Sequence, residues 1–511
     1  MGALAARPLE DALTMAKEDF EAIIRELLSP EAAQMSHSSL EQLLSERGLE
    51  LMRKLFQAHL DARGAGEAAA PVRGADGIDR EDARLHDRGL STVFGEVRVR
   101  RTGYGAEGVD SLHPLDAELN LPPEQYSFGL RRKAALEAAK GSFDETVASL
   151  ARDTGTEVPK RQVEELVQRA AVDFDAFYAQ HTLPAPSSTS SVLVITADGK
   201  GVVMRPADLR EATRKAAANR EHKLDRRLSK GEKRNAKRMA TVAAVYTVAP
   251  YVRTPEEVAR LLAPVHQADE SKRPRPENKR VWASLEKDPE QVLEEAFAEA
   301  ERRDPDHLKT WVAVVDGNEP QLKALHTLAR RHQVSLTIVV DLIHVCEYLW
   351  AAALCFHAED DPAREDWVQE RLMRTLCGNG SQVAAGMRRS ATLRGLPPKA
   401  REAVDDGADY LLKYARHLRY DEYLRKGLPI ATGVIEGACR HLVKDRMDVT
   451  GARWSLGGAE AVLRLRALRA SGDFDEYWQF HEKREYERNH AQRYHSGKVV
   501  PVRKHHLKRV K

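Results

Sequence analysis

Three acidic residues, each next to an apolar segment, are the first candidates for chemistry in this sequence. Asp198 and Asp316 each follow a short apolar run, and each is followed by glycine. Glu436 falls in the first turn of an expected amphipathic helix, for which Thr432 is a candidate N-cap. Short apolar runs bounded by turn residues are typical of buried strands. Because α/β sheets place their sites at the carboxyl ends of strands, we expect both aspartates at such a site, with Glu436 added by its helix.

A set of three carboxylates suits a hard divalent cation. No cluster of Cys or His accompanies them, so Mg²⁺ or Mn²⁺ is the expected ion. Two such ions about 4 Å apart activate a water or a 3′-hydroxyl and stabilise the leaving oxygen of a phosphodiester. Three carboxylates suffice to hold them, since Mg²⁺ keeps several waters. The spacing alone also permits a plainer interpretation, in which each Asp-Gly pair is a turn and Glu436 complements a helix dipole.

A further aspartate complicates the assignment. Asp341 also ends an apolar strand, and His344 follows it after two intervening residues. Asp341 therefore competes with Asp316 for the role of second metal ligand. Alternatively, Asp341 and His344 support the site or help to hold flanking DNA. The plain structural alternative is that Asp341 caps a helix and His344 is a core histidine.

The segment that carries these residues alternates strands with helices. Strands are expected over residues 192–198, 239–248, 310–316 and 336–341, and helices over 288–303 and 321–332. Gly199 and Gly201 predict a tight turn into a second strand directly after Asp198. Over residues 310–357, the alternation of strands with helices indicates a parallel arrangement covered by helices. We therefore expect an α/β core over residues 190–357, an all-helical insertion over 358–430 and a Glu-bearing core segment over 431–475.

The N-terminal part of the chain has a different pattern. Residues 1–63 have apolar positions at helical spacing, and residues 64–88 are rich in Gly, Ala and charge, which predicts a linker. Over residues 89–183 we expect a hairpin with its turn at Gly95-Glu96, followed by helices. A capping box at Ser142-Phe-Asp-Glu145, a break near Gly155 and a second helix from Pro159 are compatible with a helix-turn-helix DNA-binding element. An ordinary helical hairpin is the alternative.

Basic residues cluster although the whole chain has a net charge of only +2. Residues 205–238 hold thirteen Lys or Arg and five Asp or Glu, a local net charge of +8, and no aromatic residue. Such a window suits salt-sensitive phosphate contacts rather than base stacking, and a solvated helix or loop is the alternative. The candidate DNA-binding residues are Arg205, Arg210, Arg214, Lys215, Arg226, Arg227, Lys233, Arg234, Lys237, Arg238, Arg440, His441, Lys444, Arg446, Arg453 and Trp454. Residues 476–511 are expected to form a basic tail.

Length and composition set the broad class. A chain of 511 residues with 42% hydrophobic and 31% charged residues is expected to form two to four soluble domains. Its four cysteines include no Cys-x-x-Cys pair, which argues against a zinc ribbon and suits a reducing cytosol. No run of about 18 apolar residues predicts a membrane span, and no signal-peptide pattern is recognised. A cytoplasmic location is therefore expected.

Four segments together resemble the ISKra group of bacterial insertion-sequence transposases, which belongs with the Mutator-like DDE transposases. They are Thr196-Ala-Asp-Gly-Lys-Gly-Val-Val203, Val314-Val-Asp-Gly-Asn318, Val340-Asp-Leu-Ile-His344 and Thr432-Gly-Val-Ile-Glu-Gly-Ala-Cys-Arg-His-Leu-Val-Lys-Asp-Arg-Met447. The resemblance covers roughly residues 90–470. It implies a ribonuclease-H-like core with an all-helical insertion, with Asp198, Asp316 and Glu436 as the DDE carboxylates. Asp341 and His344 match the family's Asp-x-x-His signature.

The resemblance also implies a function. The expected activity is metal-dependent DNA cleavage at element ends and joining of the 3′-hydroxyl to target DNA, with two Mg²⁺ or Mn²⁺ ions. The expected partners are double-stranded DNA, as terminal inverted repeats and target, and further copies of the chain on that DNA, in the nucleoid-associated cytoplasm of a bacterium. The alternatives are a ribonuclease-H-like endonuclease without strand transfer and a transposase-derived DNA-binding protein.

Overall fold

The computed structural model describes residues 9–183, 185–218, 236–262, 273–449 and 451–503. The chain divides into two compact units. The first unit combines the residues up to Gln180 with those from Asp473 onward, and the second runs from His181 to Gly472. Of the helices that the structure describes, none is both long and apolar enough to cross a bilayer.

The first unit begins with a helical hairpin, as the helical spacing predicts. Helix α1 (Leu9–Leu27) packs against α2 (His37–Ala62), which the Ser36 side chain caps by accepting from the Ser39 amide. Ion pairs of Lys54 with Asp19 and of Arg47 with Glu26 join the two helices along their length. Residues 1–63 thus form helices over their described part.

A three-stranded antiparallel sheet follows, where the sequence suggested a linker and a short hairpin. The strands are β3 (Asp82–Thr92), β4 (Gly95–Ala106) and β5 (Val109–Leu112), preceded by the small pair β1 (Val72–Arg73) and β2 (Asp79–Arg80). Residues 64–88 are therefore partly strand, because the alternation of charged and apolar residues starts earlier than expected. The turn lies at Val93-Phe94 and not at Gly95-Glu96, because Thr92 pairs with Gly95. Gly95 has a φ of 105°, so it ends the turn as the first residue of β4.

The helices after this sheet follow the sequence pattern closely. They are α3 (Pro114–Glu118), α4 (Phe128–Lys140), α5 (Phe143–Thr154), α6 (Lys160–Ala170) and α7 (Phe174–Gln180). Ser142 and Glu145 form the predicted capping box at the start of α5. Gly155, with a φ of 63°, ends α5, and α6 begins after Pro159. The helix–turn–helix order is confirmed, whereas its role in DNA binding stays a prediction.

The C-terminal segment is folded over its described residues rather than a tail throughout. Helix α21 (Phe474–Asn489) belongs to the first unit. The Tyr477 hydroxyl on this helix donates to the Ala170 carbonyl at 2.6 Å, and Trp478 is buried. The aromatic residues among its charges are what pack α21 onto α7 and its neighbours. The prediction for residues 504–511 lies outside the described residues.

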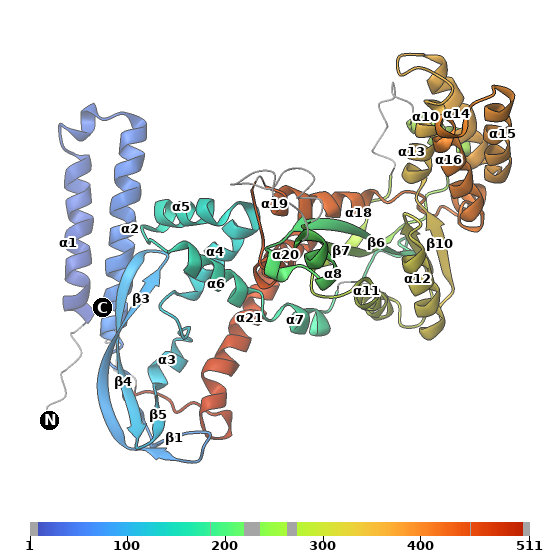
Figure 1. Ribbon diagram of the computed structural model, residues 1–511. Coiled ribbons are helices and arrows are strands. Elements are labelled where there is room, and N and C mark those ends of the chain that lie inside the picture. The colour runs from blue at the N-terminus through green and yellow to red at the C-terminus, as the bar shows by residue number, and fades with distance from the viewer. Residues whose placement is uncertain (1–8, 184, 219–235, 263–272, 450, 504–511) are drawn as a thin grey trace. The chain divides into compact units, whose positions relative to one another are not determined.

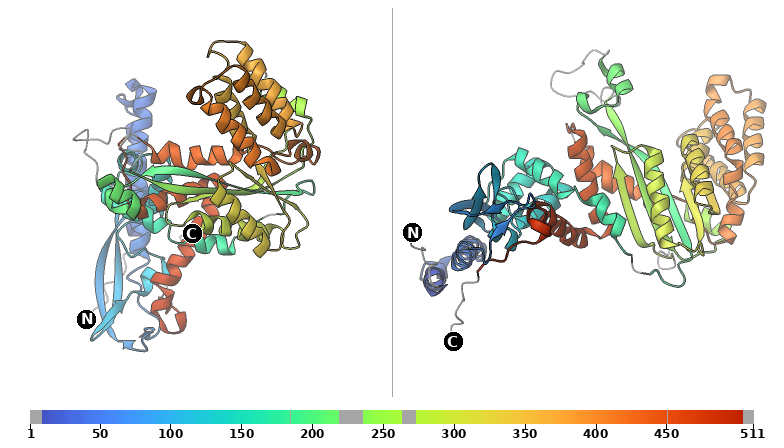
Figure 2. Two further views of the ribbon diagram at one scale, coloured as in Figure 1. Left: turned by 45° about the vertical axis from the view of Figure 1, so that its right-hand side comes forward. Right: turned by 90° about the horizontal axis from the view of Figure 1, so that it is seen from below.

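The second unit is built on a mixed five-stranded sheet in the order β10-β9-β6-β7-β8 (Figures 1 and 2). The strands are β6 (Val192–Val203), β7 (Lys237–Val248), β8 (Glu277–Ser284), β9 (Thr310–Val315) and β10 (Leu336–Val340). Strands β6, β9 and β10 are parallel, whereas β7 pairs antiparallel with β6 and with β8. The sheet is therefore mixed and not parallel throughout.

Two sequence predictions about this sheet are wrong. Gly199 and Gly201 do not turn the chain, because both pair with β7 and β6 continues without a break to Val203. Strand β8 is missing from the strands expected from sequence, since its first half, Glu-Asn-Lys-Arg, is polar. Arg280 is nevertheless buried, paired with Glu299 of helix α11 (Pro289–Arg303) at 2.7 Å and stacked over Trp282.

Helices flank the sheet and fill the insertion. Helix α12 (Glu319–Arg331) follows β9, and α13 (Leu342–Ala353) follows β10. Residues 358–430 contain helices and turns and no strand, in line with the expected insertion; its helices are α14 (Ala363–Leu376), α15 (Gly380–Leu393), α16 (Glu402–Lys413) and α17 (Tyr420–Arg425). Figure 1 shows α14, α15 and α16 gathered beside α13. The chain is thus a mostly helical α/β protein with one mixed five-stranded sheet in its second unit.

Candidate functional site

The register of the parallel strands brings three aspartates to one edge of the sheet. The last regular pairs are Thr196 with Val314 between β6 and β9, and Val340 with Val315 between β10 and β9. Continued by one or two positions, this register sets Asp316 beside Asp198 on one side and Asp341 on the other. Main-chain bonding supports the second neighbour, because the Asp341 amide donates to the Val315 carbonyl at 2.8 Å. Asp316 and Asp341 thus lie at adjacent strand ends, and Asp198 lies two residues past the last pair of β6 with β9.

Asp198 lies inside β6, where the strand passes beyond its last pairing with β9. Its Oδ1 accepts from the Gly199 amide, and its Oδ2 accepts from the Cys439 thiol at 3.2 Å. Burial and the nearby Asp198 carboxylate raise the pKa of Cys439, so this thiol is a neutral donor at physiological pH. Cys439 stands three residues after Glu436 and starts a π-helical segment, Cys439–Lys444. Single turns of π-helix are frequent at functional sites.

Asp316 begins a tight turn between β9 and α12. Gly317 has a φ of 92°, a conformation that favours glycine. The Asp316 Oδ1 accepts from the Asn318 amide at 3.2 Å, and Asn318 caps α12 through the Gln321 amide. The main-chain carbonyl of Asp316 accepts from the Tyr410 hydroxyl at 2.8 Å. The carboxylate therefore projects from a turn that is fixed on both sides.

Asp341 is fully buried, and both of its oxygens are engaged. Oδ1 accepts from the amides of Ile343 and Thr432, and Oδ2 accepts from the Thr432 hydroxyl and lies 3.4 Å from His344 Nδ1. The hydrogen bond that His344 donates to Asp341 raises the pKa of His344 to about 9, so this histidine is cationic at neutral pH. Asp341 is thus both the cap of α13 and the anchor of the chain just before Glu436.

Glu436 lies on α18 (Gly433–Ala438), and its side chain is exposed. The sequence predicted that the Thr432 side chain caps this helix. It does not, because the Thr432 hydroxyl donates to Asp341 instead. Partial burial, followed by the charges of Asp341, Glu347 and Asp198, raises the pKa of Glu436, while the His344 charge lowers it. The Glu436 carboxylate is therefore close enough to Asp341 and Asp198 to be repelled by their charges.

The three candidate carboxylates do not form a compact cage. Among the described residues, the group whose ligand atoms all lie within 4.8 Å of one another is Asp173, His481 and Glu485 in the first unit. That group is paired with arginines, because Arg488 contacts Asp173 and Arg131 contacts Glu485. It is therefore an ion-pair network and not a cation site. The wider set of Asp198, Asp316 and Glu436 has the oxygen donors that Mg²⁺ or Mn²⁺ prefers, and waters complete such shells.

Some of the candidate DNA-binding residues are exposed and others are not. Arg205, Arg210, Arg214, Lys215, Arg440, His441, Lys444 and Arg453 are exposed. Lys237 and Arg238 are half-buried, and Arg238 donates to the carbonyls of Leu285 and Asp208. Arg226, Arg227, Lys233 and Arg234 lie outside the described residues.

Arg446 and Trp454 require a correction, because both are buried and cannot meet DNA in this conformation. The Arg446 guanidinium lies 4.6 Å from the centre of the Trp454 ring, whose Nε1 donates to the Met447 carbonyl. Trp454 also bonds the end of β6, since its amide donates to Val203 and its carbonyl accepts from Arg205. Both side chains therefore fix the segment after the Glu436 helix. This junction also brings the exposed Arg205 and Arg453 onto neighbouring segments.

The helix-turn-helix candidate has cations of a different kind. Lys160 and Arg161, at the start of α6, are exposed, but Lys160 lies 2.7 Å from Asp144 and Arg161 lies 3.3 Å from Glu165. Both charges are thus balanced within the helices. Ion pairs of this exposed kind break at little cost, so they leave the DNA-binding interpretation open.

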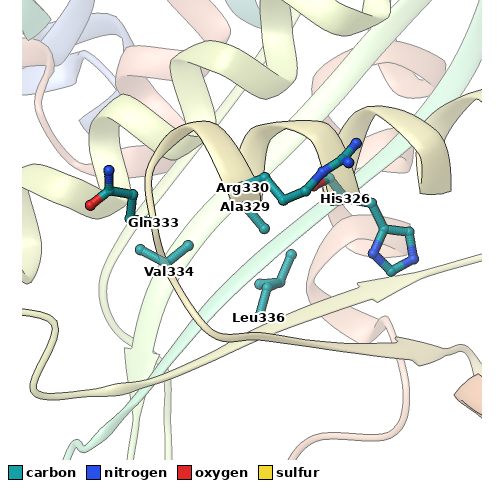
Figure 3. A pocket seen from close by; sticks show the side chains of 6 residues that line it. All are labelled: His326, Ala329, Arg330, Gln333, Val334 and Leu336. Atoms are coloured by element: carbon teal, nitrogen blue, oxygen red, sulfur yellow. The ribbon is translucent and has the colours of Figure 1, made fainter.

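A surface pocket lies away from these residues. Figure 3 shows its lining: His326, Ala329, Arg330, Gln333, Val334 and Leu336. It sits where α12 ends and β10 begins. The aspartates lie past the opposite ends of the strands, so the pocket is not part of the candidate site.

The sequence did not single out two side chains at this site. Tyr410 comes from the helical insertion, and nothing in its sequence neighbourhood marks it. Cys439 had a usable signal, since a residue three positions after Glu436 lies on the same side of a helix. Their contacts with Asp316 and Asp198 need the folded chain to be seen.

Comparison with known proteins finds distant similarity to solved structures only at the level of shape. No family model matches the chain, and no curated protein does. Among solved structures, the chain is similar to the Drosophila P element transposase strand transfer complex, with 9% sequence identity over 73% of this chain and 83% of that chain. The TM-score is 0.24, which is too low for the match to carry an argument about fold or function. The resemblance to the ISKra group therefore stays a prediction from the sequence motifs.

Proposed function

We propose that this chain is a DDE transposase that cuts DNA at element ends and joins the freed 3′-hydroxyl to target DNA. The single observation that supports the proposal is that β6, β9 and β10 are parallel neighbours, so that Asp198, Asp316 and Asp341 all follow the last regular pairs of these strands at one edge of the sheet. The helix of Glu436 packs against β6 and β7 at this sheet, and its charge interacts with that of Asp198. The mixed strand order and the helical insertion before Glu436 are compatible with the ribonuclease-H-like core that the motifs imply.

Asp198, Asp316 and Glu436 are the residues that would hold two Mg²⁺ or Mn²⁺ ions. When bound, the ions supply activation of the attacking hydroxyl and stabilisation of the leaving oxygen. The donor set fits such ions because it offers three carboxylates from three segments and no competing thiolate: the Cys439 thiol is protonated and donates. Burial and then the neighbouring carboxylates raise the pKa of Glu436, and a cation among these carboxylates would relieve the repulsive part.

Asp341 supports the site and is not a ligand in this proposal. Its side chain is fully buried and its oxygens are used by Thr432, Ile343 and His344, whereas Asp198 and Asp316 are half-buried and so are more open to a cation. The bond to Thr432 sets the position of the Glu436 helix relative to the end of β10. His344, cationic at neutral pH, is the positive side chain among these carboxylates and is suited to a phosphate of flanking DNA.

The DNA would lie across the exposed cations near the end of β6. Arg205, Arg210 and Arg214 lie on one segment, and Arg453 follows on the segment that pairs with Arg205. Arg440 and Lys444 are exposed on the turns that follow Glu436. Contacts of this type neutralise phosphates without reading sequence. Several copies of the chain would assemble on the DNA, since two element ends must be handled together.

Cleavage and joining assays on cloned element ends test the proposal, with Mg²⁺ as the added ion. Wild-type protein is expected to nick and join the DNA. Asp316→Asn keeps the shape of the turn but removes charge, so both reactions should be lost while DNA binding persists. Asp341→Asn, its matched control at the next strand end, should be milder. Activity in Asp316→Asn together with a dead Asp341→Asn would move the second ligand to Asp341.

The assay also separates the alternatives. A protein that cuts but never joins is a ribonuclease-H-like endonuclease without strand transfer. A protein that binds the ends but does neither is a transposase-derived DNA-binding protein. Normal cutting and joining by Asp316→Asn, Asp341→Asn and Glu436→Gln would refute the two-metal proposal itself.

A further inference from the structure

The helical insertion contacts the turn that presents Asp316. Tyr410, on α16, is buried, and its hydroxyl donates to the main-chain carbonyl of Asp316 at 2.8 Å. Burial, and then the nearby Tyr348 and Asp316, raise the pKa of Tyr410, so the phenol stays protonated and donates at any pH at which the protein functions. This bond comes from 94 residues further along the chain and crosses from the insertion to the sheet.

Aromatic packing holds Tyr410 in place from two sides. Its ring stacks on Tyr348 of α13, with centroids 4.2 Å apart and an interplanar angle of 26°. Tyr414 meets it edge-on, with centroids 4.8 Å apart. Pairs of this geometry contribute beyond the area they bury. Since α13 starts at Asp341, one end of the stack is tied to the neighbouring strand end.

The turn itself leaves no room on this side. A Cβ on Gly317 would lie 3.2 Å from the Tyr414 ring and 3.3 Å from the Tyr410 hydroxyl. The Asp316 carbonyl belongs to the peptide plane between Asp316 and Gly317. A hydrogen bond to it therefore fixes the rotation of that plane and, through it, the direction of the Asp316 side chain.

We propose that Tyr410 is a positioning residue, through which the helical insertion orients the Asp316 carboxylate for its cation. The inference rests on the proposed function, because it takes Asp316 as a metal ligand. It assigns the insertion a part in forming the catalytic site. Tyr410 does not touch DNA or the ions in this proposal; it acts through the main chain of Asp316.

Tyr410→Phe tests the inference because it removes only the hydroxyl. Mn²⁺ binding to the DNA-free protein, followed by the electron paramagnetic resonance of free Mn²⁺, is the readout. Without this bond the Asp316 carboxylate has to be ordered when the ion binds, and an ordering cost of about 1 kcal/mol raises the Kd for Mn²⁺ about fivefold. Tyr348→Phe is the matched control: it removes a hydroxyl from the same stack but not the one bonded to Asp316, and should bind Mn²⁺ as the wild type does.

The remaining variants keep the outcomes separable. Gly317→Ala strains the same turn from the other side and should also weaken Mn²⁺ binding. Equal Mn²⁺ affinity of Tyr410→Phe, Tyr348→Phe and wild type would refute the role of Tyr410 and leave the proposed function standing. Equal affinity of Asp316→Asn and wild type would instead refute the metal site. A fall in the Tm of Tyr410→Phe without a change in Mn²⁺ affinity would make Tyr410 a purely structural residue.

Discussion

The two units each gather acidic side chains, but they balance the charge in opposite ways. In the first unit, Asp173 and Glu485 are buried together with Arg131, whose side chain is 0% exposed, and with His481. Burial alone would raise the pKa of Asp173, but hydrogen bonds from His481 and Arg488 lower it overall. In the second unit, Glu436 has a raised pKa, and His344 is the cation that acts on it.

This difference separates a structural ion-pair network from the carboxylates to which the proposed function assigns a cation. Carboxylates whose charge is cancelled by arginines have no need of a metal, and breaking such a buried pair is costly. Carboxylates that repel one another persist where a cation or substrate will compensate them. The compact group in the first unit resembles a metal cluster by distance alone, yet its arginines exclude that role. Charge balance, more than spacing, distinguishes the two regions.

The largest expected effect comes from applying one substitution to both regions. Asp173→Asn leaves Arg488 and His481 without their carboxylate, so we expect a loss of about 3 kcal/mol in the free energy of unfolding. Asp316→Asn keeps the acceptor for the Asn318 amide and removes repulsion, so its effect should stay within about 0.5 kcal/mol. The free energy of unfolding is measured for each unit by denaturant titration, with hydrogen–deuterium exchange as the probe. Equal losses in both variants would contradict it.

Added cation sharpens the same comparison. Mg²⁺ or Mn²⁺ at about 100 times its Kd should stabilise the second unit by about 2.7 kcal/mol. Glu436→Gln should remove this gain, whereas Asp173→Asn should retain it although the protein starts from a lower stability. The measurement is the Tm of each protein with the ion and in buffer without divalent cations. If the ion no longer stabilises Asp173→Asn but still stabilises Glu436→Gln, the cation binds in the first unit and the proposal is wrong.

Features that depend on residues close together in the sequence could be predicted, whereas features that depend on residues far apart in the sequence could not. The strands that precede Asp316 and Asp341, the capping box at Ser142 and the helices over residues 358–430 follow from local patterns, and the structure confirms these elements. The continuation of β6 through Gly199 could not be predicted from local patterns, because pairing with β7 outweighs the preference of glycine for turns. Burial of Arg446 and Trp454 was also missed, since both belong to a basic segment whose composition is typical of a surface.

The candidate site shows the same limit. Asp198 and Asp316 were selected from sequence by their place after apolar runs, and Glu436 by its place in the first turn of a helix; the parallel register of β6 and β9 then accounts for both aspartates lying at one edge of the sheet. What separates Asp341 from Asp316 is invisible in the sequence, because both follow similar strands. The distinction lies in Thr432, 91 residues further along, which occupies Asp341 and leaves Asp316 available.

The exposed cations of the two units are expected to differ in their contribution to DNA binding, and the expected effect is smaller than those above. Replacing Arg205, Arg210, Arg214 and Arg453 by Gln should weaken binding to all DNA sequences and lower the slope of log affinity against log salt by about 0.9 for each phosphate that is no longer neutralised. Replacing Lys160 and Arg161 in the first unit should change the slope less, because Asp144 and Glu165 already pair with them. Binding to random-sequence duplexes at several salt concentrations decides this. An unchanged slope in the fourfold variant would remove the phosphate role of this surface.

The smallest expected effect concerns His344, the cation within the acidic site. Its pKa is about 9 in the folded chain, mainly through the hydrogen bond to Asp341, against about 6.5 in an unfolded chain. A raised pKa means that the folded state binds the proton more tightly. The stabilisation is therefore complete below pH 6.5 and is lost as the pH rises through 9. Because the side chain is 37% exposed, solvent screening reduces the effect to the order of 1 kcal/mol. The free energy of unfolding of metal-free protein should thus fall between pH 6.5 and 9.5 in wild type and fall less in His344→Gln. Parallel pH profiles for the two proteins would show that His344 is not the cation that balances this site, and the contrast with the arginine-balanced network would then have to rest on the repulsion among the carboxylates alone.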